Sequence, residues 1–384
     1  MSSNNWKNYK LDEIAEIIGG GTPSTTNPDF WGEEIPWITP RDLASTDERF
    51  ISRGERCITK KGLQNSSARL LPAGTVLLTT RAPIGYLRIA LNPICTNQGF
   101  KSLIPKVHIA DNQFLFYLLK NNVEYLKSVG VGTTFAEISG SALRQIEFLF
   151  PSLSTQRRIA DILSALDDKI ELNRQTNATL EAIAQAIFKE WFVNFNFPGA
   201  TGEMIESELG MIPKGWKVGK LGEICEFAYG KGLKSEIRVE GKYPVVGSNG
   251  IVGTHNDYLA EGPGIVIGRK GTIGEVTWVH QNFFPIDTTF YINDLLGVND
   301  LYFHYFLLKE QDFKKIGSDS AVPGLNRNQA YVSLVVIPAK DVINQFNDIT
   351  QAIFADIYNY SNESSTLATI RDTLLPKLMS GEIE

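Results

Sequence analysis

The sequence predicts an α+β protein in which two globular domains are joined by two long helices, arranged as a pseudo-two-fold repeat. Three observations support this fold class. Similar segments occur in the same order in both halves of the 384-residue chain. Each half contains short β-branched runs interrupted by glycine and proline. Each half then ends in a long stretch whose apolar residues follow heptad spacing. The predicted boundaries are 1–152 (first globular domain), 153–196 (central long helix), 197–339 (second globular domain with its entry linker) and 340–384 (C-terminal long helix).

The repeat is clearest at the start, in the middle and at the end of each globular domain. An apolar strand ends at Pro151 in the first half and at Pro338 in the second. The other matching segments are Trp6–Ile14 with Trp216–Ile224, Gly74–Gly85 with Gly264–Gly274, and Gln113–Lys120 with Leu301–Lys309. The two copies differ most between Ile14 and Gly74. We therefore expect one common architecture with different surface loops.

Local patterns within each copy predict both strands and helices. The β-branched runs Val76–Thr80 and Gly264–Ile267 are typical of buried strands, and Gln113–Asn121 is typical of a short helix. The first long helix is expected to begin near Ser154, whose hydroxyl can cap the unpaired amides of the first turn.

The two long helices have matching heptad seams. With Ala184 and Trp191, and with Asn173 and Asn177 at its polar midpoint, the first seam alternates spacings of four and three residues. Its other members are Ile159, Leu163, Leu166, Ile170, Leu180 and Ile187. The apolar members of the second seam are Phe346, Ile353, Ile357, Leu367 and Leu374, with Tyr360 and Ser364 at its midpoint. This pattern predicts an antiparallel coiled coil with one globular head at each end. The alternative is that each helix packs only on its own head.

Composition argues against metal and disulfide chemistry and against membrane insertion. The three cysteines are far apart in the sequence, and the four histidines are scattered. No apolar run has the length of a membrane span, and the first residues contain no apolar signal core. We therefore expect a cytoplasmic protein without a metal site and without a membrane partner.

The net charge of −6 is unevenly distributed along the chain. Residues 1–150 and 212–340 carry a small excess of Lys and Arg, whereas residues 151–211 and 341–384 are acidic. Phosphate binding requires local positive potential rather than a basic total. The heads can therefore contact nucleic acid, and the helices are expected to face protein.

Basic and amide side chains are concentrated in the variable loops of each head. Arg and Lys neutralise phosphates, while Asn, Gln, Ser and Thr form hydrogen bonds with base edges. The candidates in the first head are Thr22, Ser24, Arg41, Lys60, Lys61, Ser66, Ser67, Arg69, Thr80, Arg81, Asn97 and Gln98. The candidates in the second head are Lys231, Lys234, Ser248, Asn249, Arg269, Lys270, Asn326, Arg327 and Asn328. The alternative for any one of them is an ordinary solvated loop residue.

The sequence contains no motif that predicts catalysis. It has no phosphate-binding loop of the Walker type and no positional arrangement typical of Ser-His-Asp or Cys-His nucleophiles. Asn194–Pro198 lacks the order of residues with which aminomethyltransferases hold a flipped adenine. Two alternatives to a DNA-binding subunit remain. One is a coiled-coil adaptor whose heads bind protein or peptide, and the other is an enzyme whose site is assembled from distant residues.

Taken together, four segments resemble the specificity (S) subunits of type I restriction-modification enzymes over essentially the whole chain. The first comprises Gly21–Ser24, Ile35–Leu43 and Gly62–Ala68; the second is Gln156–Ala160 with Leu166–Ile170; the third is Glu206–Trp216; the fourth is Leu374–Ile383. The combination of these segments in this order is highly specific for the family.

The resemblance implies a non-catalytic subunit of an adenine-N6 methyltransferase and ATP-dependent endonuclease. It implies that each head is a target-recognition domain for one half of an asymmetric bipartite site in double-stranded DNA. It also implies that the coiled coil sets the gap and docks modification subunits, of which two are expected, and that restriction subunits join the complex. S-adenosylmethionine, ATP and Mg are expected on those partners, with no cofactor in this chain. Ile159–Trp191 would form about 48 Å of helix, which would place the head centres on the order of fourteen base pairs apart.

Overall fold

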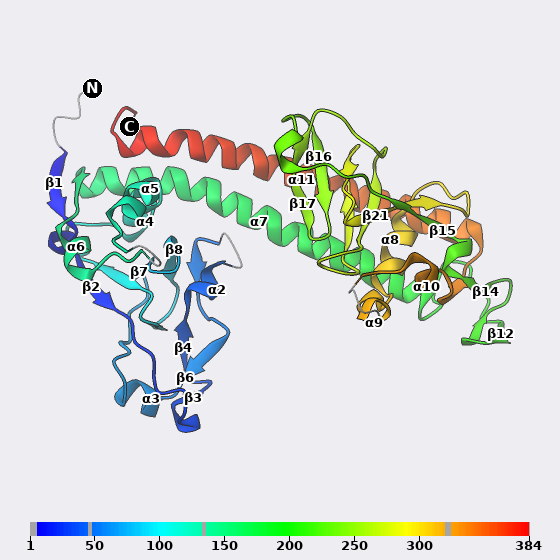
Figure 1. Ribbon diagram of the computed structural model, residues 1–384, viewed down its shortest axis with the longest axis horizontal. Coiled ribbons are helices and arrows are strands. Elements are labelled where there is room, and N and C mark those ends of the chain that lie inside the picture. The colour runs from blue at the N-terminus through cyan, green and yellow to red at the C-terminus, as the bar shows by residue number, and fades with distance from the viewer. Residues whose placement is uncertain (1–5, 45–47, 133–135, 319–323, 384) are drawn as a thin grey trace. The chain divides into compact units, whose positions relative to one another are not determined.

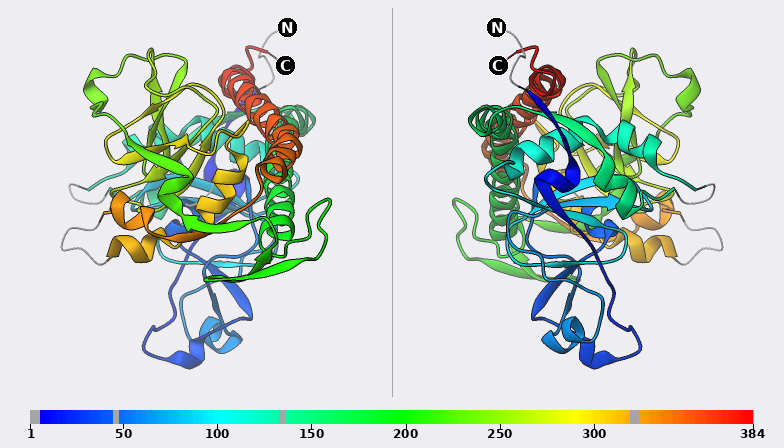
Figure 2. Two further views of the ribbon diagram at one scale, coloured as in Figure 1. Left: turned by 90° about the vertical axis from the view of Figure 1, so that its right-hand side faces the viewer. Right: turned by 90° about the vertical axis from the view of Figure 1, so that its left-hand side faces the viewer.

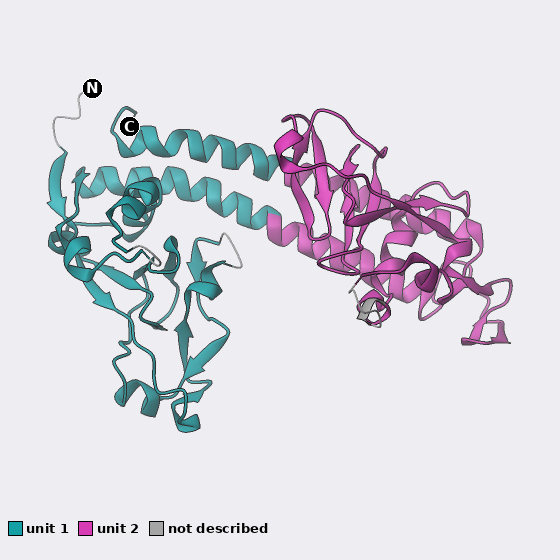
Figure 3. Cartoon of the chain, viewed as in Figure 1, with its two compact units in different colours: residues 1–173, 362–384 teal, residues 174–361 magenta. Residues whose placement is uncertain are grey.

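The computed structural model describes residues 6–44, 48–132, 136–318 and 324–383. It consists of two compact units (Figure 3), unit 1 with residues 1–173 and 362–384, and unit 2 with residues 174–361. The boundary crosses both long helices, so each unit contains one head together with half of each helix. We call the head of unit 1 head 1 and that of unit 2 head 2. None of the helices in the described part of the chain combines the length and hydropathy that a membrane span requires.

Head 1 is built from three sheets and short helices (Figure 1). Strand β1 (Lys7–Lys10) pairs with β11 (Glu147–Phe150). A five-stranded sheet has the order β2-β10-β7-β8-β5, and a four-stranded sheet has the order β3-β6-β4-β9. Their strands are β2 (Ala15–Gly19), β3 (Trp31–Gly32), β4 (Ile35–Ile38), β5 (Phe50–Ile51), β6 (Arg56–Ile58), β7 (Val76–Thr80), β8 (Ile84–Ala90), β9 (Cys95–Thr96) and β10 (Lys101–Pro105). The helices are α1 (Leu11–Ile14), η1 (Pro28–Phe30), α2 (Pro40–Ala44), α3 (Lys60–Gln64), α4 (Asn112–Asn121), α5 (Val123–Val129) and α6 (Gly140–Gln145).

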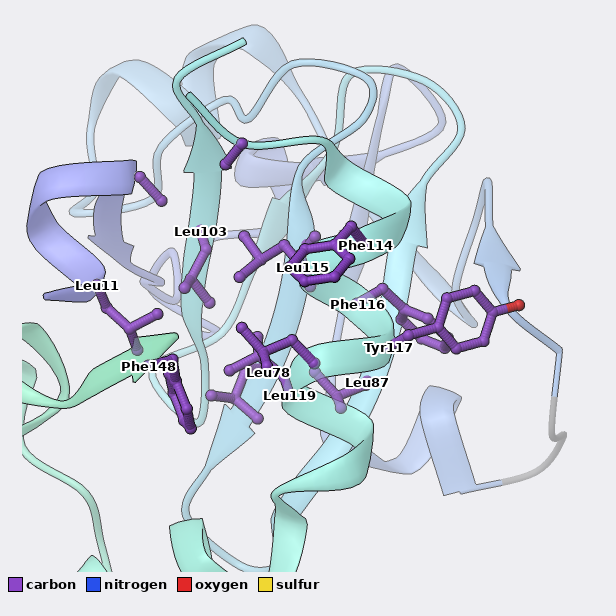
Figure 4. Close-up of a cluster of buried hydrophobic side chains, with 14 of the residues drawn as sticks. Leu11, Leu78, Leu87, Leu103, Phe114, Leu115, Phe116, Tyr117, Leu119 and Phe148 are labelled. Carbon is purple, nitrogen blue, oxygen red and sulfur yellow. The ribbon is translucent and has the colours of Figure 1, made fainter. Parts of the chain in front are cut away.

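The main core of head 1 lies where α4 packs on the five-stranded sheet. Figure 4 shows Phe114, Leu115 and Leu119 of α4 directed toward Leu78 and Leu103 of the sheet. Asp111 caps this helix by accepting hydrogen bonds from the amides of residues 113 and 114. The four-stranded sheet has its own smaller core around Trp37, and with α3 it forms a separate lobe of unit 1 that is visible in Figures 1 and 2. We call residues 24–37 and 56–66 the lobe.

Head 2 repeats this plan with different strand lengths. Its four-stranded sheet has the order β15-β21-β18-β19, and a three-stranded sheet has the order β17-β16-β20. Two further pairs are β14-β22 and the linker hairpin β12-β13. The strands are β12 (Met204–Ser207), β13 (Gly210–Pro213), β14 (Lys217–Lys220), β15 (Cys225–Tyr229), β16 (Tyr243–Gly247), β17 (Gly250–His255), β18 (Gly264–Gly268), β19 (Val276–Val279), β20 (Phe284–Pro285), β21 (Thr289–Asp294) and β22 (Leu334–Ile337). The helices are η2 (Leu221–Glu223), η3 (Ser235–Ile237), α8 (Tyr302–Lys309), α9 (Phe313–Ser318) and α10 (Arg327–Tyr331).

Matching backbone hydrogen bonds show that the two heads share one scaffold. At the entry to each head, the amide of Lys10 or Lys220 donates to a glutamate three residues later. Further pairs join the same loops at nearly equal donor–acceptor distances. In head 1 these bonds are Thr80 N to Gly99 O (2.8 Å), Asn97 N to Ile38 O (2.9 Å) and Ile138 N to Thr80 O (3.0 Å). In head 2 they are, in the same order, Arg269 N to Thr288 O (2.9 Å), Ile286 N to Val246 O (3.0 Å) and Leu325 N to Arg269 O (2.9 Å). Because backbone groups alone make the three paired loop bonds, those bonds are compatible with many different side chains.

The two long helices are α7 (Leu153–Phe192) and α11 (Lys340–Met379). The first begins at Leu153, and Ser152 rather than Ser154 provides the capping hydroxyl, which accepts the amide of Thr155 at 3.3 Å. Helix α7 ends at Phe192 rather than at residue 196.

The helices pair in the antiparallel direction within both units (Figure 1). In unit 1, Asn173 Nδ2 donates to Glu363 Oε2 at 2.8 Å and to Ser364 Oγ at 3.2 Å. In unit 2, Asn177 Nδ2 donates to Ser361 Oγ at 3.0 Å. All predicted seam positions are buried or partly buried. The predicted antiparallel pairing is therefore confirmed, and its polar midpoint is hydrogen-bonded across the helices.

Candidate nucleic-acid interface

Head 1 brings four loops together at one end of its five-stranded sheet. We call residues 20–24, 66–69, 80–82 and 97–99 loop cluster 1. Gly21 N donates to Thr96 O at 2.8 Å, and the Thr22 hydroxyl donates to the Gln98 side chain. A Cβ atom on Gly21 would lie 2.4 Å from Ser67 Oγ, so glycine is required for this close approach. The predicted residues Thr22, Ser67 and Gln98 therefore lie on one surface.

The lobe holds another group of predicted residues. Helix α3 is capped by Thr59, whose hydroxyl accepts the amide of Gly62 at 3.0 Å, and Lys60 and Lys61 occupy its first turn. Ser24 lies beside the lobe's aromatic core, because its carbonyl accepts the indole N–H of Trp31 at 3.1 Å. The side chains of Ser24, Lys60 and Lys61 are exposed.

Carboxylates partly neutralise the basic side chains of head 1. Lys61 Nζ lies 2.6 Å from Asp29, Arg81 Nη1 lies 3.6 Å from Glu137, and Arg41 Nη1 lies 3.9 Å from Glu55. These pairs are largely exposed, so each contributes about 1 kcal/mol or less to stability. They nevertheless reduce the local positive potential that a phosphate would meet.

Two other basic or polar side chains of head 1 are buried instead of being exposed to solvent. Arg49 is buried and donates a hydrogen bond to the hydroxyl of Tyr117 at 2.9 Å, so it supports the fold of head 1. The side chain of Thr80 is also fully buried, with its amide bonded to Gly99 O, and it supports the loop instead of facing solvent.

The remaining candidates of head 1 lie at the surface. Arg69 is exposed, and Ser66 Oγ accepts the amide of Ala68 at 3.3 Å. Asn97 is partly buried, because its side-chain carbonyl accepts the amide of Gly99 at 2.9 Å.

Head 2 assembles an equivalent group of loops, which we call loop cluster 2: residues 229–232, 248–250, 268–271, 286–288 and 325–328. Lys231 N donates to Pro285 O at 3.0 Å, and Leu325 N donates to Arg269 O at 2.9 Å. A Cβ atom on Gly271 would lie 3.0 Å from Ser248 Oγ. The predicted residues Lys231, Ser248, Arg269, Lys270 and Arg327 are therefore neighbours in space.

Among the other candidates of head 2, Asn249, Asn326 and Asn328 lie in loop cluster 2, and Lys234 lies outside it. Asn249 is exposed in the turn between β16 and β17, and Lys234 is exposed beside η3. Asn326 caps α10 by accepting the amide of Asn328 at 2.9 Å, which commits its side-chain oxygen to the helix. Asn328 itself is exposed.

Tyr229 is a component of loop cluster 2 that the sequence patterns did not indicate. Its ring lies 4.9 Å from the guanidinium carbon of Arg269 and 4.8 Å from that of Arg327. Its side chain is 49% exposed. The available signal was weak: an aromatic residue at the end of a strand, immediately before the Gly230–Lys231 turn. Two arginines that are distant in the sequence but contact the same ring can be recognised only from the three-dimensional structure.

The titratable groups give no indication of a nucleophile or a metal centre. Burial raises the pKa of the Cys95 and Cys225 thiols to about 12, so both remain protonated and unreactive near neutral pH. Among the residues that the structure describes, no three His, Cys, Asp or Glu side chains are grouped as a metal site would require. The polar groups of the two loop clusters are instead hydrogen-bond donors and acceptors suited to binding.

Comparisons with known proteins agree with this geometry. The family model for the type I restriction modification DNA specificity domain matches residues 3–182 and 213–330. The chain is 37% identical to the type I restriction enzyme MjaIX specificity subunit of Methanocaldococcus jannaschii, over 98% of this chain and 93% of that protein. It is 25% identical to the HindI specificity subunit of Haemophilus influenzae, over 98% and 99% of the two chains.

A solved structure supports the same fold. The S subunit of a type I restriction-modification system from M. genitalium superposes with a TM-score of 0.61 at 21% identity, covering 98% of this chain and 97% of that one. The matched heads, the paired helices and the family model lead to one identification. The chain belongs to the type I restriction-modification DNA specificity family, in which it is the non-catalytic subunit that provides DNA sequence specificity.

Proposed function

We propose that each head recognises one half of an asymmetric bipartite sequence in double-stranded DNA, through loop cluster 1 with the lobe in head 1 and through loop cluster 2 in head 2. One observation carries the proposal. The same backbone scaffold, in two copies, collects basic and amide side chains from loops far apart in the sequence at the same end of its sheet. Such side chains are the groups that bind phosphates and base edges.

We further propose that the helices separate the two heads and dock modification subunits, with two such subunits in the complex. Ile162, Leu172 and Ile183 of α7 have exposed side chains. Ile162 and Leu172 lie in unit 1 and Ile183 lies in unit 2, so the part of α7 in each unit carries exposed apolar side chains. Exposed apolar side chains on a helix are suited to contact with a protein partner.

Restriction subunits would complete the assembly. In that assembly, S-adenosylmethionine, ATP and Mg would bind to the partner subunits. This chain would supply only the sequence recognition that directs their chemistry.

The test of recognition is to map methylated adenines in DNA exposed to the assembled complex. We expect a bipartite motif in which Lys60→Glu or Lys61→Glu weakens recognition of one half, and Lys231→Glu or Lys270→Glu weakens recognition of the other. Matched controls are Lys7→Glu and Lys217→Glu, which lie on the exposed first strand of each head, outside the loop clusters. Unchanged recognition after charge reversal in both heads would refute the placement of the interface. Salt titration excludes a peptide-binding adaptor if affinity falls steeply with ionic strength.

The test of the spacer is to delete one heptad from α7 together with the facing heptad of α11. The loss of seven residues shortens a helix by about 10 Å, which corresponds to roughly three base pairs. We expect the gap in the methylated motif to shorten, and an unchanged gap would contradict a spacer role.

A further inference from the structure

Two arginines in loop cluster 2 are held on the face of one tyrosine. The guanidinium carbons of Arg269 and Arg327 lie 4.9 Å and 4.8 Å from the centre of the Tyr229 ring, although the arginines come from different loops. The ring itself packs against Phe290 of β21, with 5.0 Å between centroids, and is thereby fixed to the sheet. A cation–π contact with a ring that is itself fixed restrains a guanidinium group, so the tyrosine limits how both arginines can be oriented.

Backbone carbonyls further restrict the two guanidinium groups. Arg269 Nη1 donates to Asp287 O at 3.3 Å, and Arg327 Nη1 donates to Phe227 O at 3.5 Å. Within the described part of the chain, neither arginine forms an ion pair with a carboxylate. Each therefore keeps its full positive charge and several N–H donors that these long contacts do not occupy.

We propose that Arg269 and Arg327 recognise guanine bases in the DNA half-site of head 2, and that Tyr229 is the positioning residue for both. This proposal rests on DNA recognition by head 2, proposed above. Guanine presents two acceptors, O6 and N7, on its major-groove edge, and the planar fork of an arginine donates to both at once. The half-site of head 2 thus contains at least one G·C pair that is required for recognition.

The restraint on the arginines favours a base edge over a phosphate. Phosphate binding needs positive charge and tolerates mobile side chains, which the exposed Lys231 and Lys270 of the same cluster supply. Base recognition needs donors in a fixed plane, because a shift of orientation breaks one of the two hydrogen bonds. The contacts with Tyr229 and with the two backbone carbonyls supply this restraint.

Head 1 provides an internal reference. The matching backbone hydrogen bonds show which residues of the two heads are equivalent. Gly19 is equivalent to Tyr229, Thr80 to Arg269 and Gly140 to Arg327. Head 1 therefore has no aromatic ring and no arginine at the matching positions. Substitutions at the tyrosine–arginine assembly should change recognition by head 2 and leave recognition by head 1 intact.

The experiment presents a pool of randomised DNA to the assembled methyltransferase complex and sequences the methylated molecules. The complexes contain the wild-type chain, Arg269→Lys, Arg327→Lys, Tyr229→Phe or Tyr229→Leu. For the wild type we expect a G·C pair in the half-site that head 2 recognises. Each Arg→Lys variant keeps the charge but not the fork, so we expect discrimination at a G·C position to fall about 10- to 100-fold. Tyr229→Phe keeps the ring and should behave as the wild type, whereas Tyr229→Leu should lose discrimination as the arginine variants do.

Each other outcome contradicts a defined part of the proposal. A half-site of head 2 without any G·C pair would refute guanine recognition. Arg→Lys variants with unchanged base preference would show that the arginines bind phosphate. Unchanged preference in Tyr229→Leu would refute the positioning role. An intact half-site for head 1 in the same reactions shows that each variant is folded and assembled. If the wild type selects no bipartite motif at all, the proposed function fails rather than the guanine assignment.

Discussion

The two heads share a backbone scaffold but present their basic side chains differently. In head 1, Arg41, Lys61 and Arg81 each lie within 4.0 Å of a carboxylate. In head 2, Arg269 and Arg327 are stacked on Tyr229 instead. The comparison shows how one fold can serve two different half-sites. Backbone hydrogen bonds hold the loops, and the side chains on them vary without cost to the scaffold.

The heads also contact the helices in different ways within their own units. In unit 1, Asp167 of α7 accepts hydrogen bonds from Tyr117 (2.6 Å) and from Arg371 of α11 (2.6 Å), in a largely buried polar network. In unit 2, the helices pack on the head through aromatic rings, and Phe346 of α11 contacts four others. The polar network of unit 1 is added to an apolar core that includes Ile159 and Leu378, whereas the aromatic cluster is particular to unit 2.

The largest expected effect is a loss of packing in unit 2. Phe346→Ala removes a fully buried ring from the aromatic cluster and should lower the free energy of unfolding by about 3–5 kcal/mol. The matching seam residue of unit 1, Ile159, is also buried, but Ile159→Val should cost only about 1 kcal/mol. Urea unfolding followed by tryptophan fluorescence measures both. Ile183→Ala, at an exposed position of α7, is the control, and an equal loss there would contradict the packing argument.

A smaller effect is expected from the polar network of unit 1. Asp167→Ala leaves Arg371 with Asp372 as its remaining partner and should cost about 2–3 kcal/mol, because the removed carboxylate is largely buried. The counterpart in unit 2 is Glu181, which accepts Tyr305 and Lys309 at 2.7 Å but is 38% exposed. Glu181→Ala should therefore cost about 1 kcal/mol or less. Urea unfolding of the two variants tests the ranking, and equal losses would show that burial does not govern it.

A modest pH effect is expected from one histidine of unit 2, His280. Burial among aromatic rings, including Tyr358 at 5.1 Å, lowers the pKa of His280 to about 4. The unfolded chain binds this proton near pH 6.5, whereas the folded chain does not, so stability should fall as pH decreases from about 6.5 to 4. His280→Phe should remove this part of the pH dependence in urea midpoints measured at pH 7 and pH 5. His108→Gln, at an exposed position in head 1, is the control and should leave the pH dependence of the urea midpoint unchanged. An unchanged pH dependence in His280→Phe would contradict the prediction.

The architecture could be predicted from the sequence because it depends on repeated apolar patterns. The heptad seams predicted the pairing of the two helices correctly, because seam positions such as Leu163 and Phe346 are buried in the chain. Helix ends were less accurate, as Ser152 shows, because several serines compete for one capping position. The division into two units was not evident, since it depends on which half of each helix a head packs against.

The candidate site could be predicted in its loops but not in its individual side chains. Composition identified basic stretches, yet it could not distinguish the buried Arg49 from the exposed Lys60 a few residues later. Nor could it reveal that carboxylates lie beside three of the predicted cations of head 1, Arg41, Lys61 and Arg81. Tyr229 was missed because its role depends on contacts with residues about 40 and 100 positions away. Such contacts are set by the sheet topology, which local patterns do not encode.

The smallest expected effect tests the electrostatic difference between the heads directly. Lys270 and Arg81 follow the matching scaffold residues Arg269 and Thr80, but only Arg81 is paired with a carboxylate, Glu137. Each phosphate neutralised by protein adds about 0.9 to the slope of log affinity against log salt concentration. Lys270→Gln should therefore lower the slope by nearly one, and Arg81→Gln by less, because Glu137 already offsets that charge. Glu137→Gln frees Arg81 and should raise the slope. Salt titration of the assembled complex on DNA measures all three. Equal decreases for Lys270→Gln and Arg81→Gln would mean that DNA displaces the ion pairs of head 1, in which case the two heads differ in free solution but not when bound.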